Sequence, residues 1–544
     1  MSNFNFFMMK MRFIAVAFAA AAILASCTKE RVQNDANVDP TSVTEGVQTY
    51  ASFNFAVASP DGSKVPLLSD ATETTPVPIN SIRLIIFKNT AQSTVCEVNK
   101  LVTLATGQMS EAMLLTSGTK KIFIVANEGT GSVANLVAAT KIIPNTSTLS
   151  DFYATLSTLD VNGSGADTYD ISQLISPSGM VLTNSADVTS TYVLAPGITK
   201  LQAESSSVGT NNKFEITVKR VVAKGKVVYG LSATDGGSNV ITADGKGVLT
   251  NLKYTIRNAR RATYLMQQFR TGAESPAGQT TNVLCPDDAA SSHEFVSSQP
   301  NYSDGWDYYR NYFYSQGVSG SNGFDFTGNI IAAASDSPSN PAYYFTENIN
   351  AIQRVANSTW ASVQTTFTPK ANQYVTSTVY DKVNGKFTTV TLGTTTPATG
   401  TLYVTTKSAV GLPAGAIFIN QTAALQAAFS VKYPDAEYLE DNSAFIAWST
   451  GAGSSDRIAE VLNTYLGGVC YYRLVFGEGS TVANTFQSGV TRNNYYKATI
   501  SKFASIGTVT EVESDPKEPL ETNTYVHVVI RVLDWNDVTS IIEL

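Results

Sequence analysis

Histidine and charged residues are scarce in this chain of 544 residues, and each scarcity excludes a class of function. The only histidines are His293 and His527, so few imidazole groups are available for catalysis or zinc binding. Charged residues make up 15 %, and the net charge of −7 offers no basic face to nucleic acid. No GxSxG, Walker A or HExxH motif is present. The sequence therefore predicts a protein that is not an enzyme, with no cofactor, no metal site and no nucleic-acid partner.

Cysteine is also scarce, which argues against a disulfide framework. Cys96, Cys285 and Cys470 form an odd and widely spaced set, and no CxxC spacing suggests a metal. We expect these three to be buried free thiols. The fourth cysteine, Cys27, lies in a different context near the start of the chain.

The first 26 residues have the pattern of an export signal. Lys10 and Arg12 precede an apolar run over 13–25, which is too short to span a bilayer. The following Leu-Ala-Ser-Cys sequence matches the bacterial lipobox, in which the signal is cut before Cys27 and that thiol is acylated. An ordinary signal with a chance cysteine is the alternative. The sequence thus predicts a precursor that a lipid anchors to the outer membrane.

Residues that favour extended structure make up the share of the composition that charged residues usually fill. Thr, Ser, Asn, Val, Tyr and Phe are abundant, and the length requires two or more domains. The predicted fold is mostly β, with two transthyretin-like or Greek-key β-sandwich domains that carry short helices. Helices are expected at 132–139 and 456–466. Strands are expected at 81–88, 112–116, 120–126, 213–233 (one long strand or a hairpin), 248–261, 360–367, 373–379, 386–392, 401–405, 469–476 and 495–503.

Three features resemble ligand sites, and a structural explanation is favoured for each. The GxGxxA sequence at 129–134, with Asp151 further on, lacks the βαβ context of a dinucleotide site, so a strand-to-helix turn is expected. Asp235 and Asp244 lie among glycines and could hold calcium, but turn chemistry explains them. The aromatic cluster at 306–314 could stack on sugars, although packing under a long loop is the simpler expectation.

An apolar strand is predicted near the start of the mature chain, at 50–58. A turn at 59–62 and then Lys64 follow it. One face of this strand is wholly apolar, and it consists of Ala51, Phe53, Phe55 and Val57.

A similar strand is predicted at the end of the chain, within 525–544. It follows a polar linker with two prolines, and a bend around Trp535 precedes a less regular stretch at 538–544. A strand this apolar at a free end needs a partner sheet, and we expect that sheet to belong to another molecule. Its apolar face consists of Val526, Val528, Ile530 and Val532.

Four stretches in a fixed order carry a family resemblance. They are the lipobox SCTKE, the strand sequence FEITVKRVVAKGKVV at 214–228, the stretch 489–507 with Arg492-Asn493-Asn494, and the terminal strand with Asp534-Trp535. In this order they resemble the fimbrillins of Bacteroidales type V pili, and most closely the major (shaft) subunit of the short Mfa-type fimbriae.

The resemblance implies how such a subunit assembles. Fimbrillins reach the surface as lipoproteins, a trypsin-like protease cuts after the first strand, and a C-terminal strand of the neighbouring subunit fills the vacated groove. Here the cut would fall between Lys64 and Val65, with lysine where the family often has arginine. Arg31 and Arg83 are less suitable, because the first would leave the strand in place and the second would destroy the next strand. The implied donor-strand residues are Val526, Val528, Ile530, Val532, Leu533 and Trp535, and the displaced-strand residues are Ala51, Phe53, Phe55 and Val57.

The implied function is that of a structural pilin, the major subunit of a surface fimbria that contributes to adhesion. Its implied partners are copies of itself, anchor and tip subunits, a surface protease, and a host or bacterial receptor. The alternatives are a tip or anchor subunit, or a surface lipoprotein that binds glycans. The expected divisions are a signal peptide (1–26), a lipidated propeptide with the removable strand (27–64), an N-terminal domain (65–235), a C-terminal domain (236–514), and a linker with the donor strand (515–544).

Overall fold

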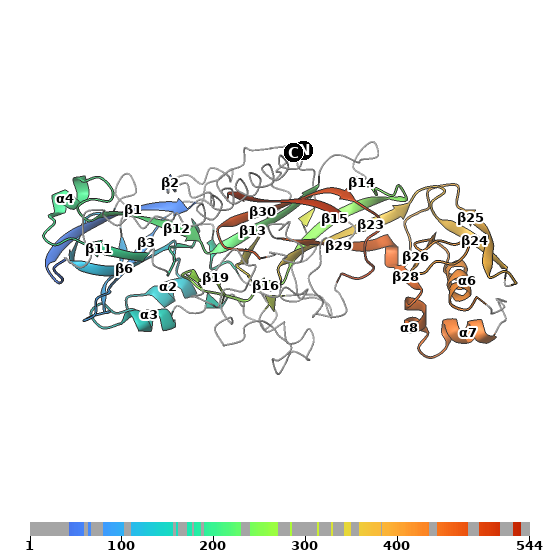
Figure 1. The fold of residues 1–544 in the computed structure, drawn as a ribbon, viewed down its shortest axis with the longest axis horizontal. Coiled ribbons are helices and arrows are strands. Elements are labelled where there is room, and N and C mark those ends of the chain that lie inside the picture. The colour runs from blue at the N-terminus through green and yellow to red at the C-terminus, as the bar shows by residue number, and fades with distance from the viewer. Residues whose placement is uncertain are drawn as a thin grey trace, which may run out of the picture. The chain divides into compact units, whose positions relative to one another are not determined.

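A computed structural model describes the fold of most of the chain (Figure 1). Within each described part the chain is mostly β with short helices, which confirms the predicted fold class. The described residues are 43–58, 64–66, 80–102, 110–155, 159–160, 171–176, 179–186, 190–229, 240–269, 283–285, 313–314, 328–329, 342–349, 358–381, 383–434, 443–476, 489–511 and 526–534.

The chain divides into two compact units. The first comprises Met1–Leu159, Ser172–Val221 and Tyr264–Phe269, and the second comprises Asp160–Ile171, Val222–Thr263 and Arg270–Leu544. The segment expected as one strand or hairpin at 213–233 is two strands that belong to different sheets. Strand β12 (Lys213–Arg220) lies in the first unit and β13 (Val222–Tyr229) in the second, so the chain passes between the units at Val221.

The first unit is built on a nine-stranded sheet with the order β2-β1-β12-β10-β6-β3-β4, to which β11 adds on β6 and β5 on β1. Its strands are β1 (Gln48–Ala58), β2 (Lys64–Pro66), β3 (Ile82–Lys88), β4 (Cys96–Val102), β5 (Met113–Thr116), β6 (Gly118–Ala126), β10 (Leu182–Thr183) and β11 (Thr191–Leu194), with β12. Its helices are α2 (Ser132–Val137), α3 (Leu149–Thr155) and α4 (Lys200–Ser205).

Apolar residues at alternate positions along the strands fill the core of the first unit. Strand β12 alternates half-buried and buried residues along its whole length, as expected for a strand with one face on a core. Its buried residues Phe214, Ile216 and Val218 pack with apolar residues of β1, β3 and β6. Helix α3 covers β6, where the rings of Phe123 and Phe152 stack with their centroids 4.5 Å apart.

The second unit contains three larger sheets. Their orders are β22-β13-β30-β31, then β14-β15-β23-β29 with β21 on β15, and β25-β24-β27-β26-β28. The strands are β14 (Val240–Ile241), β15 (Gly247–Arg257), β21 (Gly328–Asn329), β22 (Tyr343–Thr346), β23 (Trp360–Pro369), β24 (Val375–Asp381), β25 (Lys386–Leu392), β26 (Leu402–Thr405), β27 (Ile417–Phe418), β28 (Leu462–Tyr465), β29 (Val469–Val475), β30 (Asn494–Phe503) and β31 (Val526–Asp534).

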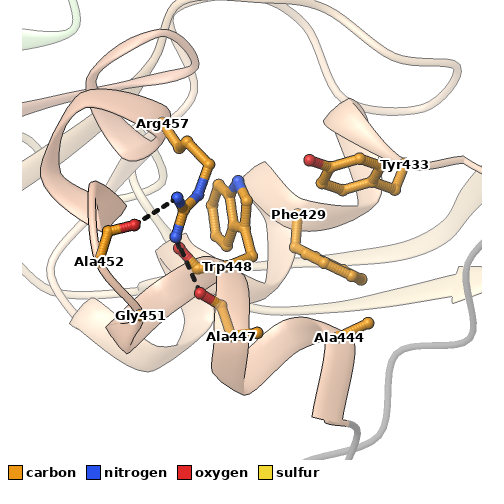
Figure 2. Close-up of a pocket in the computed structure, with 8 residues that line it drawn as sticks. All are labelled: Phe429, Tyr433, Ala444, Ala447, Trp448, Gly451, Ala452 and Arg457. Atoms are coloured by element: carbon orange, nitrogen blue, oxygen red, sulfur yellow. Dashed lines mark hydrogen bonds between the residues drawn. The ribbon is translucent and has the colours of Figure 1, made fainter.

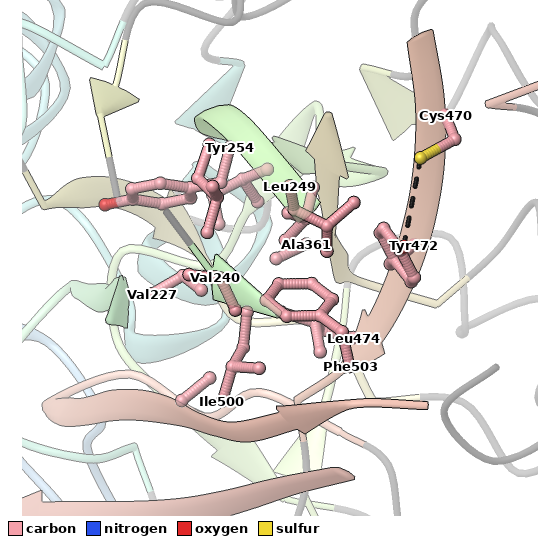
Figure 3. Packing of buried hydrophobic residues seen from close by; sticks show 14 of the residues in the cluster. Val227, Val240, Leu249, Tyr254, Ala361, Cys470, Tyr472, Leu474, Ile500 and Phe503 are labelled. Carbon is pink, nitrogen blue, oxygen red and sulfur yellow. Dashed lines mark hydrogen bonds between the residues drawn. The ribbon is translucent and has the colours of Figure 1, made fainter. Parts of the chain in front are cut away.

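Two separate clusters of buried side chains support the second unit. The larger one joins the first two sheets, and Figure 3 shows Leu249, Ala361, Leu474 and Phe503 meeting within it. The smaller one lies between the third sheet and three helices. These helices are α6 (Gln421–Lys432), α7 (Ser443–Thr450) and α8 (Ser454–Ala459). We call the part of the chain from β24 to β28, with its own core, the helical module.

The helices of this module differ from those predicted from the sequence. The expected helix at 456–466 is only its first part, α8, and the residues that follow form β28, which pairs with β26. Leu462 and Tyr465 are buried because the strand places them in the sheet. The longest of the three, α6, was not predicted, although Asn420 caps it by accepting a hydrogen bond from Ala423 N (3.0 Å). Its buried face is mostly alanine, a weak hydrophobic signal.

The Arg492-Asn493-Asn494 stretch has a structural role at the start of β30. The Arg492 guanidinium pairs with the Glu347 carboxylate, and both side chains are completely buried. Asn493 has a φ of 65°, a left-handed conformation that asparagine tolerates, and its N–H donates to Val222 O (2.8 Å). These contacts fix the start of β30 beside β13.

The cysteine prediction is confirmed for Cys96, Cys285 and Cys470, which are free and buried. Burial raises the pKa of the Cys96 thiol to about 12 and also raises the pKa of Cys470, so neither thiol is reactive at neutral pH. Among the helices that the structure describes, none is long and apolar enough to cross a membrane.

Removing the Arg492 side chain should destabilise the second unit strongly. Arg492→Ala leaves the buried Glu347 carboxylate without its guanidinium, and the expected loss in unfolding free energy is about 3–5 kcal/mol. Chemical denaturation followed by circular dichroism measures it. The matched control is Lys432→Ala, which breaks the exposed pair with Glu460 and should change stability little. Equal effects of the two substitutions would contradict the assigned role of Arg492.

Candidate functional site

Strand β1 has backbone partners along both of its edges. It pairs in parallel with β12, from Ser52 opposite Lys213 to Val57 opposite Val218. On the other edge it pairs antiparallel with β5 through residues 48–51 and with β2 through residues 56–58. If β1 left, it would therefore open a groove with unpaired N–H and C=O groups on both walls.

Side chains of β1 fill the core beneath that groove. Of the residues predicted on its apolar face, Ala51 and Phe53 are completely buried and Phe55 is 2 % exposed. The ring of Phe53 stacks on Phe214 of β12 with the centroids 6.2 Å apart. The side chain of Val57 lies outside the described residues.

The start of β1 is held by a buried polar contact set around Thr49. The Thr49 hydroxyl donates to Ala195 O (2.8 Å) and accepts from Ile198 N (3.1 Å) and from the amide Nδ2 of Asn212 (2.9 Å). The same Asn212 amide also lies within hydrogen-bond distance of Tyr50 O (3.1 Å) and Ala195 O (2.9 Å). Thr49 and Asn212 are both buried, so these contacts replace water at the mouth of the groove.

The opposite face of β1 is covered by helix α4. Ser52 is completely buried there, and its hydroxyl donates to Ala203 O of the helix (2.5 Å). A capping box between Thr199 and Gln202 begins this short helix. The groove is therefore closed on one side by α4 and on the other by the core.

The expected cleavage site lies in the edge strand next to β1. Lys64 and Val65 belong to β2, which pairs with the end of β1 so that Lys64 is opposite Ala58. Their side chains, and the turn at 59–63 before them, lie outside the described residues, as do the signal peptide and Cys27. The cleavage site and the lipidation site stay predictions.

The expected donor strand is an edge strand of the second unit. Strand β31 pairs antiparallel with β30, from Val526 opposite Phe503 to Asp534 opposite Asn494. Its partner was expected in another molecule, whereas here the backbone partner belongs to the same chain. Among the described residues β30 is its only partner strand, so one edge of β31 has no ladder. The side chains of Val526, Val528, Ile530, Val532 and Leu533, and all of Trp535, lie outside the described residues.

Asp151 and Asp244, which resembled parts of ligand sites in the sequence, make local hydrogen bonds. The Asp151 carboxylate accepts from the backbone N–H and the hydroxyl of Thr148 (both 2.8 Å) at the start of α3, and these hydrogen bonds lower its pKa. Asp244 accepts from Thr242 Oγ1 and Lys246 N within a turn. Asp235 and most of 306–314 lie outside the described residues. The described part of the chain contains no group of acidic, cysteine or histidine side chains that could hold a metal ion.

The helical module contains a pocket that the sequence did not predict. Its volume is about 560 Å³, within the range of small-ligand sites. Figure 2 shows Arg457 beside the Trp448 ring, with Phe429 and Tyr433 further along the pocket. The lining residues are Phe429, Tyr433, Ala444, Ala447, Trp448, Gly451, Ala452 and Arg457.

Two buried N–H donors in this pocket have no partner among the described residues. The Arg457 guanidinium caps the end of α7 by donating to the carbonyls of Ala447 (2.8 Å) and Ala452 (2.7 Å), which uses both of its terminal nitrogens. Its Nε and the Nε1 of Trp448 remain unpaired. Trp448 is only 4 % exposed, and both unpaired nitrogens are shielded from solvent.

One protein family matches the C-terminal region of the chain. Residues 463–540 match the family described as "Major fimbrial subunit protein type IV, Fimbrillin, C-terminal", and this match includes β29, β30 and β31. It confirms the resemblance to fimbrillins and indicates a structural, not an enzymatic, protein. No curated protein sequence matches the chain.

Solved structures of low sequence identity align over most of the chain. A Parabacteroides distasonis protein assigned to cell adhesion is 12 % identical, with 91 % of this chain and 99 % of that chain covered and a TM-score of 0.41. A Porphyromonas gingivalis fimbrilin is 12 % identical (90 % and 98 % covered, TM-score 0.37). The tip fimbrial protein Mfa3 of that organism is 10 % identical (90 % and 100 % covered, TM-score 0.32). These TM-scores are too low to support an argument about function, which therefore rests on the family match.

Proposed function

We propose that this chain, which carries the C-terminal region of a fimbrillin in residues 463–540, is the major shaft subunit of a surface fimbria. The fimbrillin match supports the fimbrial role and a location in a surface fimbria. The proposal adds the route of assembly. The precursor is anchored at the outer membrane through Cys27, a trypsin-like protease cuts between Lys64 and Val65, and the subunits join by donor-strand exchange.

The contrast between the two terminal strands supports this proposal best. Strand β1 is paired on both edges, so its departure leaves two unpaired ladders. Strand β31 has one partner strand among the described residues. A β31 that moves into the groove of a neighbouring subunit exchanges a one-sided ladder for a two-sided one and closes the neighbour's open core.

Burial of apolar side chains adds to the free energy that favours the exchange. Val526, Val528, Ile530 and Val532 alternate as the core residues of β1 do. At ~1.5–3 kcal/mol for each side chain taken from water, the four contribute on the order of 6–12 kcal/mol. Ordering the linker and separating β31 from β30 subtract from that sum. Because the donor and the groove lie at different places on each subunit, the contact is head-to-tail, and its repetition without closure into a ring produces a fibre.

A tip or anchor subunit of the same fimbria is the nearest alternative. An anchor would keep its first strand, and a tip would not need to donate one. This chain has both a first strand followed by a basic residue and an apolar last strand, which together favour the shaft.

Processing at Lys64 is the first testable consequence. N-terminal sequencing of polymer extracted from the cell surface should give Val65 as the first residue. Lys64→Gln should leave monomeric precursor that still contains β1, because trypsin-like proteases require a basic residue before the cut. Lys64→Arg is the control and should be processed normally. Polymer whose chains begin at Cys27 would refute the removal of β1.

Loss of the donor strand is the second consequence. A chain that lacks 525–544 should be cut and exported normally but remain monomeric, because no strand is available to fill the groove of the next subunit. Gel electrophoresis without heating, which preserves fimbrial ladders, measures the outcome. Ladders that persist after the deletion would show that another segment joins the subunits.

The pocket of the helical module favours a second role, the binding of a neutral saccharide in adhesion. Both terminal nitrogens of Arg457 are engaged by carbonyls, so its guanidinium offers no bidentate site for a carboxylate. Tyr433, which is 39 % exposed, presents a ring on which the apolar face of a sugar can stack.

Tyr433→Ala tests this second role, because it removes the exposed ring on which a sugar would stack. In titrations with a panel of neutral oligosaccharides followed by calorimetry, we expect saturable binding that this substitution weakens about 3–10-fold. Leu466→Ala, an exposed residue outside the pocket, is the control. No saturable binding by the unmodified protein, or equal binding by Tyr433→Ala, would contradict the saccharide site.

A further inference from the structure

We propose that β31 of one subunit enters the groove of the next in a single register, in which residues 526–533 take the places of residues 49–56. This inference rests on the proposed strand exchange and specifies its geometry. The donor runs in the same direction as β1, parallel to β12. Arg531 of the donor then lies opposite Glu215 of the acceptor subunit, because Asn54 is opposite Glu215 in the structure.

The groove has two positions that accept a polar side chain without burying it. Within 49–56 only Tyr50 and Asn54 are half-buried, and they lie four residues apart. A replacement strand can therefore carry polar residues at these two positions and needs apolar or small residues at the others. The other residues of this stretch are all buried: Thr49, Ala51, Ser52, Phe53, Phe55 and Ala56.

The donor strand has the same spacing of polar residues. Over 526–533 (VHVVIRVL) only His527 and Arg531 are polar, and they too lie four residues apart. The proposed register puts these two at the half-buried positions and an apolar residue at every buried one. Tyr525 then lies at the position of Gln48, which is exposed.

Charge complementarity favours the same alignment. Glu215 is a half-buried residue of β12, and its neighbour across the ladder is Asn54. With Arg531 in place of Asn54, a guanidinium lies beside the Glu215 carboxylate on the same face of the sheet. Salt screens a partly buried pair less than an exposed one, so this contact distinguishes the proposed register from its neighbours.

A register moved by two residues keeps one apolar face inward but buries polar side chains. Moved one way, the donor places Arg531 at Ala56, which is 5 % exposed. The same move places His527 at Ser52, which is completely buried. Moved the other way, the donor places Arg531 itself at Ser52. Burial of the guanidinium disfavours both alternatives.

A donor that ran in the opposite direction would also match the two half-buried positions. Leu533 would then lie at the position of Gln48, which is exposed. Tyr525 would lie at the position of the buried Ala56, where its hydroxyl would need a partner. The parallel direction avoids both mismatches.

The proposed register loses one hydrogen bond, at the position of Thr49. The Thr49 hydroxyl accepts from Ile198 N, and Val526 in its place offers no acceptor. The Asn212 amide still donates to Ala195 O, so that carbonyl keeps a partner. One unmatched N–H disfavours this register less than a buried guanidinium disfavours the others.

The end of the donor carries a carboxylate, Asp534. It lies at the position of Val57, whose backbone pairs with Val65 at the edge of the sheet. The proposed cut gives Val65 a free α-ammonium. The Asp534 carboxylate therefore comes close to a positive charge that exists only after processing.

Cysteine pairs measure the register and the direction directly. A disulfide needs Cα atoms within about 7 Å, which residues opposite each other satisfy and residues displaced by two along a strand do not. Glu215→Cys should be combined, in separate variants, with Arg531→Cys, Val529→Cys, Leu533→Cys or His527→Cys, and polymer of each variant should be oxidised.

We expect Arg531→Cys to give covalent ladders at least ten times more efficiently than the other three donor variants. Preferential ladders from Val529→Cys or Leu533→Cys would overturn the register, and those from His527→Cys would overturn the direction, while strand exchange itself would stand. Polymer without intermolecular disulfides in any variant would instead overturn strand exchange into this groove.

A second cysteine pair keeps the proposed ion pair intact. Ser52 is opposite Lys213, so the register places Val529 of the donor opposite Lys213 of the acceptor. If the Glu215→Cys variants do not polymerise, Lys213→Cys with Val529→Cys should give covalent ladders. Polymer of this variant without such ladders would overturn the register.

Charge reversal tests the ion pair. Arg531→Glu should lower the yield of polymer several-fold, because it places two carboxylates side by side. Combining it with Glu215→Arg should restore most of the yield. A double variant that polymerises no better than Arg531→Glu alone would overturn the pairing of these two residues.

A threonine at position 526 tests the register without a cross-link. Val526→Thr supplies the missing acceptor for Ile198 N and should raise the temperature at which unheated polymer ladders dissociate. Val528→Thr is the matched control, because it puts a hydroxyl at the completely buried Ala51 and should lower that temperature. A lower dissociation temperature for both variants would overturn the register.

Discussion

The two-sided pairing of β1 is the constraint on which the first unit depends. A strand with ladders on both edges, two phenylalanines in the core and a helix above it is an integral part of its sheet. Such a strand cannot leave without exposing unpaired backbone groups and apolar pockets. The unit is therefore stable only while the groove is occupied, whether by its own strand or by another.

The second unit provides the strand that can meet this requirement. Among the described residues β31 pairs with one strand, β30, and its other edge carries no ladder. Under the proposed exchange, β31 would be an edge strand in the precursor and a central strand in the polymer. Strict alternation from Val526 to Val532 would present one apolar face to the groove.

Much of this arrangement could be predicted from the sequence, because period-two alternation is a local signal. It located β1, β3, β6, β23, β29, β30 and β31 within a few residues. This signal failed where the buried face of an element is only weakly hydrophobic, as in the alanine-rich α6. It also failed at 456–466, where Leu462 and Tyr465 fit a helical period but belong to a strand whose partner, β26, lies about sixty residues earlier.

The polar contacts could not be predicted, because they join residues that are far apart in the chain. Thr49 meets Asn212, and Glu347 meets Arg492, only after the sheets have formed. The Arg492 stretch was noticed as a family feature, yet its partner gave no sequence signal. The pocket beside Trp448 likewise depends on how three short helices pack.

The occupant of the groove in the assembled fimbria tests this account most directly. A cryo-electron microscopy map of the purified polymer should show residues 526–532 of one subunit between β12 and β5 of the next, with no density for β1. A map in which β1 still fills the groove, while β31 remains on β30 of its own chain, would contradict assembly by strand exchange.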